Sequence, residues 1–158
     1  MADLVIRKAE EKDTSRLNAA LRELSEYMGD DHPITDETLG RLMFEGHAHS
    51  EALLAENDGE LVGVCLYAPF ISTNLGGLAV YVSDLWVHDS MRGQGLGPKL
   101  MSAVVDQWGD QVKFIRLSVY NDNPKAREVY IRLGFKGEPK AEFLQLYAED
   151  FKNIRKSA

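Results

Sequence analysis

The sequence has little cysteine and no long apolar run, and these absences narrow the kinds of protein it can be. Cys65 is the only cysteine among 158 residues, so an intramolecular disulfide cannot form and a thiolate metal site is not expected. Cys65 lies in the apolar run "LVGVCLYA", where we interpret it as a small buried hydrophobic residue. No stretch approaches the roughly 20 apolar residues that a membrane span needs, and the first residues lack a signal-peptide pattern. We therefore expect a soluble, cytoplasmic protein with no membrane partner.

Basic residues are scarce relative to acidic ones, at 18 against 25, which gives a net charge of −7. This balance argues against a nucleic-acid partner and favours cationic ones. The four histidines have no metal-ligand residues at suitable spacing beside them, so we expect no metal site. The chain also lacks repeats and linkers, and its 44% hydrophobic content suffices for one core. These features predict a single domain over residues 1–158.

Strands and helices are predicted to interleave along the chain. Asp13 and Thr35 can each cap a helix, and Asp58 with Gly59 is a typical hairpin turn. The predicted strands cover residues 4–9, the two apolar runs around Asp58, and residues 76–89, 113–120 and 143–148. The predicted helices follow Asp13, Thr35, the glycine-rich segment after Arg92, and Asn123. This order predicts an α/β protein with a mixed sheet that contains a βαβ unit.

Three glycines fall within five positions, at Gly93, Gly95 and Gly97, between an apolar strand and an apolar helix. The spacing fits neither the dinucleotide fingerprint, because Pro98 stands where the third glycine belongs, nor the P-loop. Glycines nevertheless let several backbone N–H groups turn toward one anion, and the start of a helix adds further attraction for it. Arg92 supplies a full positive charge beside them. The segment is therefore either a phosphate site or a plain tight turn.

A second polar cluster lies in "YNDNPKAREVYIRLGF", about 25 residues downstream of the glycines. Asn123 precedes Pro124 and is suited to cap the helix that follows. Ala126 and Tyr130 are four residues apart and share one face of this helix. Taken alone, the segment is an amphipathic helix with a capping asparagine and a core tyrosine.

Together the two segments resemble the GNAT superfamily of N-acetyltransferases. The acetyl-CoA signature of that superfamily is Arg/Gln-x-x-Gly-x-Gly/Ala, and the run Arg92–Gly97 matches it at every fixed position. Its downstream pattern is matched by Asn123, Ala126, Tyr130, Gly134 and Phe135. The resemblance extends from about Leu4 to Tyr147. It implies the GNAT fold, a mixed central sheet with two splayed parallel strands and helices on both faces.

The resemblance also implies a set of residues that bind acetyl-CoA as co-substrate. The pyrophosphate would lie on the glycine loop, and the pantetheine arm would pair with backbone on the strand before it, near Asn123 and Tyr130. The implied cofactor-binding residues are Leu85, Trp86, Val87, Arg92, Gly93, Gln94, Gly95, Leu96, Gly97, Asn123, Ala126 and Tyr130.

Attack of an amine on a thioester requires a neutral amine and a proton for the departing thiolate. Tyrosine has an unperturbed pKa of about 10 and stays protonated at neutral pH, so Tyr130 is the predicted general acid. Asp84, an isolated carboxylate in the apolar run "YVSDLWV", is predicted to hold the substrate ammonium or to remove its proton through a water. The alternative is a satisfied carboxylate at a strand end. His88 is a further candidate base, but its place near the glycine loop favours a plain loop histidine.

Among GNAT enzymes the chain most resembles the diamine and polyamine acetyltransferases. In that group Asp84 matches a carboxylate of the amine site, and Tyr27 lies where the first helix closes it. Two features depart from the group: Ser83 stands where a second acid is common, and "FISTNLGG" has no tryptophan. The predicted substrate is a small cationic primary amine, such as a diamine, a polyamine or an amino acid side-chain amine. The alternatives are a protein or peptide acetyltransferase and a non-catalytic acyl-CoA-binding module, and the segment "EFLQLYAEDF" favours a homodimer.

Overall fold

The computed structural model describes residues 3–156. The chain divides into two compact units, Met1–Ser118 and Val119–Ala158, and each has its own architecture. The assignment of residues 1–158 to one domain stays a prediction.

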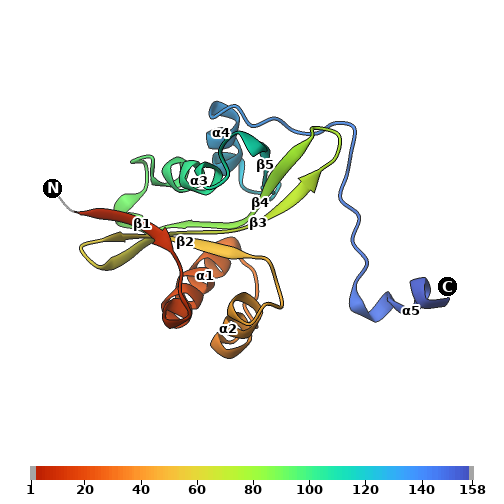
Figure 1. Ribbon diagram of the computed structural model, residues 1–158, viewed down its shortest axis with the longest axis horizontal. Coiled ribbons are helices and arrows are strands. Elements are labelled where there is room, and N and C mark those ends of the chain that lie inside the picture. Colours follow the sequence, from red (N-terminus) through yellow and green to blue (C-terminus); the bar gives the residue numbers. More distant parts are fainter. Residues whose placement is uncertain (1–2, 157–158) are drawn as a thin grey trace. The chain divides into compact units, whose positions relative to one another are not determined.

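The first unit is built on a five-stranded mixed sheet (Figure 1). Its strands are β1 (Leu4–Lys8), β2 (Glu51–Asn57), β3 (Glu60–Ser72), β4 (Gly77–Val87) and β5 (Val112–Arg116), and they lie side by side in that order. Neighbouring strands are antiparallel except for β4 and β5, which are parallel. Asp58 and Gly59 both have positive φ angles, of 52° and 82°, at the turn between β2 and β3. The predicted mixed sheet and its hairpin are therefore confirmed.

Helices cover both faces of this sheet (Figure 1). Helices α1 (Thr14–Met28) and α2 (Asp36–Phe44) pack on one face, and α3 (Leu96–Asp106) lies on the other. The core beneath α1 and α2 contains Leu17, Ala20, Leu21, Leu39, Ala52, Leu54, Val64 and Trp86. Short 3-10 turns precede α1 and follow β4 and α3, at Glu11–Asp13, Asp89–Met91 and Gly109–Gln111. The sheet with helices on both faces is the fold that the sequence predicted.

The two parallel strands part at their carboxyl ends. Strand β4 pairs with β5 only from Leu78 to Tyr81, because β5 stops at Arg116 while β4 continues to Val87. Residues 82–87 therefore pair with β3 on one side and not with β5 on the other. The strand predicted over residues 113–120 is accordingly too long at its carboxyl end, because the chain leaves β4 after Arg116 and a strand needs hydrogen bonds to a neighbour.

Asp13 has a different role from the predicted one. It directly precedes α1, but its side chain caps no helix N–H group of α1. Its two carboxylate oxygens instead accept from the guanidinium of Arg7, at 2.9 Å each, and Arg16 also donates to Oδ1, at 3.1 Å. A charged partner outcompetes a single capping bond, so the prediction for Asp13 is wrong. The predicted cap at Thr35 is confirmed, since its hydroxyl accepts from the N–H of Thr38 at 3.1 Å.

The second unit contains α4 (Pro124–Arg132), a 3-10 turn at Ala148–Asp150 and the short helix α5 (Lys152–Lys156). Helix α4 is confirmed, with Gly134 at a φ of 101° just after its end. The strand predicted over residues 143–148 is wrong. Phe143 and Leu144 are 68% and 85% exposed, and residues 141–147 have no regular structure. Apolar alternation gives strand propensity, but a strand also needs a paired neighbour, and the described part of this unit has no strand to supply one.

Candidate active site

The glycine loop has the backbone conformation that an anion cradle needs. Gly93 and Gly95 have φ angles of 74° and 79°, in the left-handed region that side chains disfavour. A Cβ atom at either position would meet nothing within 4 Å, so the space in front of the loop is open. Helix α3 starts directly after the loop, and its first N–H groups have no partner within the helix. The loop therefore combines open space, free backbone donors and the positive end of a helix dipole.

Arg92 links this loop to two other predicted site residues. Its guanidinium pairs with Asp89 at 2.8 Å, and its Nε donates to the carbonyl of Val87 at 3.1 Å. The same guanidinium lies 5.2 Å from the centre of the Tyr27 ring, at the end of α1. Tyr27 is 68% exposed. The structure thus brings Tyr27 of the predicted amine site next to Arg92 of the predicted phosphate site.

Strand β4 presents neighbouring side chains to opposite faces of the sheet beside the loop. Leu85 pairs with Cys65 and approaches Gly97 on the side of α3. Asp84 pairs with Leu66, on the face that packs against α1 and α2. The side chain of Trp86 is buried in that same core, at 4% exposure, so only its backbone is available to a ligand.

The register of β4 against β3 skips one residue next to Asp84. Val82 pairs with Tyr67 and Asp84 pairs with Leu66, which leaves Ser83 as an extra residue. The Ser83 hydroxyl donates to the carbonyl of Leu66 at 3.2 Å. Strand β4 therefore has a β-bulge at Ser83, and the backbone polar groups that a bulge leaves unpaired are available to a ligand.

Asp84 is a partly buried carboxylate with altered acidity. Burial raises the pKa of Asp84 above its ordinary value, and the Ser83 hydroxyl and the charge of His32 act in the opposite direction. A carboxylate that holds its proton more tightly than usual is a better base. Perturbed acidity beside an open strand edge is typical of functional residues.

The other predicted site residues lie in the second unit. Asn123 caps α4, where its Oδ1 accepts from the N–H of Ala126 at 3.3 Å. Tyr130 lies one turn further along the helix, half-buried, with its ring 5.5 Å from that of Phe135. The capping interpretation of Asn123 is thereby confirmed, and its amide nitrogen is still a donor. The roles of Asn123 and Tyr130 toward a ligand stay predictions.

Comparison with known proteins decides the family. The Acetyltransferase (GNAT) family matches residues 17–135, which include the glycine loop, β4 and α4. The chain belongs to the GNAT acetyltransferases. It is 32% identical to the thialysine N-epsilon-acetyltransferase of Sus scrofa. The 152 aligned residues cover 90% of this chain and 89% of the relative. It is also 29% identical over 91 residues to the spermine/spermidine N(1)-acetyltransferase of Bacillus subtilis strain 168, across 54% of this chain and 59% of the relative.

A solved structure shares the fold of this chain. An integron cassette protein from the mobile metagenome of V. cholerae superimposes with a TM-score of 0.79, at 19% identity, over 97% of this chain and 98% of that one. The resemblance inferred from the two sequence segments is confirmed by the family match over residues 17–135. No helix within residues 3–156 is long and apolar enough to cross a membrane.

Sequence reasoning missed one polar network in this GNAT enzyme, on the loop between α1 and α2. Asn18 is fully buried on α1 and binds both His32 and Asp36. His32 also binds the hydroxyl of Ser25, at 2.9 Å. The available signal was Asn18 itself, because an asparagine next to Leu17 on the buried face of an amphipathic helix needs buried partners. By contrast, the loop interpretation of His88 is supported, since its Nδ1 accepts from the N–H of Ser90.

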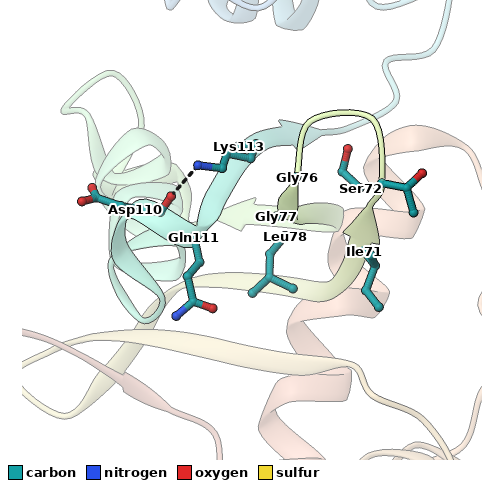
Figure 2. Close-up of a pocket in the computed structure, with 9 residues that line it drawn as sticks. Ile71, Ser72, Gly76, Gly77, Leu78, Asp110, Gln111 and Lys113 are labelled. Carbon is teal, nitrogen blue, oxygen red and sulfur yellow. Dashed lines mark hydrogen bonds between the residues drawn. The ribbon is translucent and has the colours of Figure 1, made fainter.

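An open depression of about 570 Å³ lies at the other end of β4 (Figure 2). Its wall includes Gly76, Gln111 and Lys113, and Figure 2 shows the Lys113 ammonium donating to the carbonyl of Asp110, at 3.0 Å. This depression borders the amino ends of β4 and β5. The glycine loop follows the carboxyl end of β4, where ligands of parallel strands bind. The depression is therefore not part of the candidate active site.

Proposed function

We propose that this GNAT enzyme transfers the acetyl group of acetyl-CoA to a small cationic primary amine, such as a diamine, a polyamine or an amino acid side-chain amine. The observation that carries the proposal is the open glycine cradle at the start of α3, next to a strand edge that β5 leaves unpaired. The names of the relatives, a thialysine and a spermine/spermidine acetyltransferase, support an amine of this class.

The residues around the glycine loop fit acetyl-CoA. The open space in front of Gly93 and Gly95 would be filled by any Cβ, which suits a ligand that approaches the backbone closely. The backbone from Gly93 to Gly97 would hold the pyrophosphate, with Arg92 beside it, and the open edge from Leu85 to Val87 would pair with the pantetheine arm. Asn123 would donate to that arm. Acetyl-CoA supplies the acetyl group as a thioester when it is bound.

Two side chains would carry the proton transfers. Asp84 would attract the substrate ammonium and take its proton at a carboxylate oxygen, directly or through a water, which leaves a neutral amine able to attack. Its raised pKa supports this role, because burial makes the carboxylate more basic. Tyr130 would hold a proton on its Oη until the departing thiolate needs one.

The charge of the protein supports a cationic substrate. The net charge of −7 attracts cations at long range. At short range a partly buried carboxylate that holds an ammonium contributes more than a surface ion pair, because fewer waters and ions screen it. Asp84 would therefore contribute to the affinity for the amine as well as to its deprotonation.

The assembly that we propose is a cytoplasmic homodimer of one-domain chains. Its support is the apolar segment from Phe143 to Tyr147, which is exposed in its own unit. A second copy could cover these side chains. Light scattering should give about twice the chain mass, and replacing Phe143 and Leu144 with serine should shift the protein to the monomer. A monomeric parent protein would contradict this assembly.

The activity is tested by following CoA release from acetyl-CoA with a panel of diamines, monoamines and peptides. We expect turnover with diamines, and a roughly 10- to 1,000-fold lower kcat/KM in Asp84→Asn, the range for loss of one charged contact. The matched control is Asp106→Asn, which removes the same charge at an exposed position on α3. Absence of CoA release with every amine would refute the function. Equal loss in both variants would refute only the role of Asp84.

A further inference from the structure

The buried side chain of Asn18 fixes the loop between α1 and α2. Its Nδ2 donates to the carbonyl of Ile34 at 3.2 Å and to a carboxylate oxygen of Asp36 at 2.7 Å. Both of these partners can only accept, so the Nδ2 end of the amide must face them. The Oδ1 end therefore faces His32, whose Nε2 lies 2.8 Å away. An oxygen acceptor at that distance assigns the hydrogen of the bond to Nε2 of His32.

The second ring nitrogen of His32 has a more adaptable partner. Its Nδ1 lies 2.9 Å from the hydroxyl of Ser25, which can donate to a neutral ring or accept from a protonated one. Both charge states of the ring therefore keep both hydrogen bonds, with only a rotation of the Ser25 hydroxyl. The network therefore holds the ring in place through both of its nitrogens.

The loop that carries His32 packs on the sheet face to which Asp84 belongs. Ile34 of this loop packs against the core cluster that contains Leu17 and Trp86. Asp84 and Trp86 are two residues apart on β4, and their partners Leu66 and Val64 are likewise two apart on β3. Both pairs therefore point to the face covered by α1 and α2. Asp84 also feels the charge of His32, which lowers the pKa of this carboxyl group against the larger effect of burial.

We propose that His32 is a positioning residue that sets the affinity of the enzyme for cationic amines. The ring, held by Asn18 and Ser25, fixes the loop beside the amine site, and the Asp84 carboxylate is the charge that attracts the substrate. A positive charge at this position opposes that attraction. The inference rests on the proposed function, because it names a determinant of substrate affinity for the same site.

The test places a permanent charge at residue 32. His32→Lys adds the charge, and His32→Gln offers an amide that can still bond Asn18 and Ser25 without one. His47→Lys is the matched control, since it makes the same change at an exposed loop residue. We expect His32→Lys to raise KM for a diamine by roughly 3- to 10-fold, with a much smaller change in kcat, as one extra charge at a partly screened separation would. We expect neither His32→Gln nor His47→Lys to reproduce that rise.

Salt separates an electrostatic effect from a structural one. The rise in KM for the diamine should shrink between about 50 mM and about 500 mM salt, because ions screen the added charge. KM for acetyl-CoA should stay within about 2-fold in every variant, a change of roughly 0.4 kcal/mol or less. Melting curves check that each variant is folded, and His32→Arg replaces His32→Lys if the lysine variant is not.

Two outcomes would overturn the inference while the proposed function stands. In the first, His32→Gln raises KM as much as the charged variants do. In the second, the rise persists at high salt, or no folded charged variant shows one although the parent enzyme acetylates diamines. A parent enzyme that acetylates no amine would overturn the proposed function itself, and this inference with it.

Discussion

Two glycines with the same backbone strain allow the cofactor role of the glycine loop to be separated from its role in folding. Gly95 lies in the loop with a φ of 79°, and Gly76 lies in the turn before β4 with a φ of 74°. A Cβ added at either position would meet nothing within 4 Å. The substitutions Gly95→Ala and Gly76→Ala should therefore cost only the left-handed conformation, about 1–2 kcal/mol each. For a chain of this length that lowers Tm by about 2–4 °C per kcal/mol.

Only Gly95→Ala should weaken binding of CoA. Its methyl group would occupy the space proposed for the pyrophosphate, and overpacking of about 1–3 kcal/mol corresponds to a roughly 5- to 150-fold higher Kd. Calorimetric titration with CoA, paired with a melting curve of each variant, measures both effects. The reasoning fails if the two variants lose similar stability and Gly95→Ala binds CoA as tightly as the parent protein. It also fails if Gly76→Ala weakens CoA binding equally.

Three further predictions concern Tyr130, Cys65 and Asp13. Tyr130→Phe removes only the hydroxyl, so turnover should fall by roughly 10- to 1,000-fold while Kd for CoA stays within a few-fold of the parent value. If turnover is unchanged when the chemical step is rate-limiting, Tyr130 is not the general acid. Burial raises the pKa of the Cys65 thiol to about 12. A thiol reagent at about pH 8 should therefore label Cys65 no faster than the protein unfolds. Rapid labelling of the native protein would contradict the burial of Cys65. The hydrogen bonds from Arg7 hold the pKa of Asp13 well below its ordinary value, which stabilises the fold above the unfolded pKa of about 4 and is lost as the pH falls further. Asp13→Asn should therefore cost about 2–3 kcal/mol at neutral pH, since its arginine partners are 30% and 36% exposed, and denaturant titrations should show this difference shrinking in acid.

The parts of the fold that follow from short stretches of sequence were predictable. The turn at Asp58 and Gly59 depends on residues that accept a positive φ, and the cap at Thr35 depends on one hydroxyl. The glycine loop before α3 could be placed for the same reason, since Gly93 and Gly95 adopt the left-handed conformation that the spacing suggested. These features are decided within a few residues, so no knowledge of distant contacts was needed.

The features that depend on distant partners were not predictable in the same way. Asp13 has the right residue type and position for a helix cap, but Arg7 on β1 and Arg16 on α1 engage its carboxylate instead. The network of Asn18 and His32 joins residues 14 positions apart through a loop whose course the sequence pattern does not give. Residues 143–148 have the alternation of a strand, but the described residues of their own unit include no strand beside them. In each case the partner decides the outcome, and a one-dimensional pattern does not identify it.

The extra residue at Ser83 reverses the alternation of side chains along β4. Val82 and Asp84 are two residues apart and would share a face of a regular strand, yet their partners Tyr67 and Leu66 are adjacent and point to opposite faces. Deleting Ser83 would restore a regular register, with Asp84 still opposite Leu66, and would remove the backbone groups that the bulge frees from pairing. The bulge thus makes the number of residues in β4 a determinant of which backbone groups are left for a ligand. We expect β4 to tolerate changes of residue type at Ser83, an exposed position, far better than any change in the number of residues.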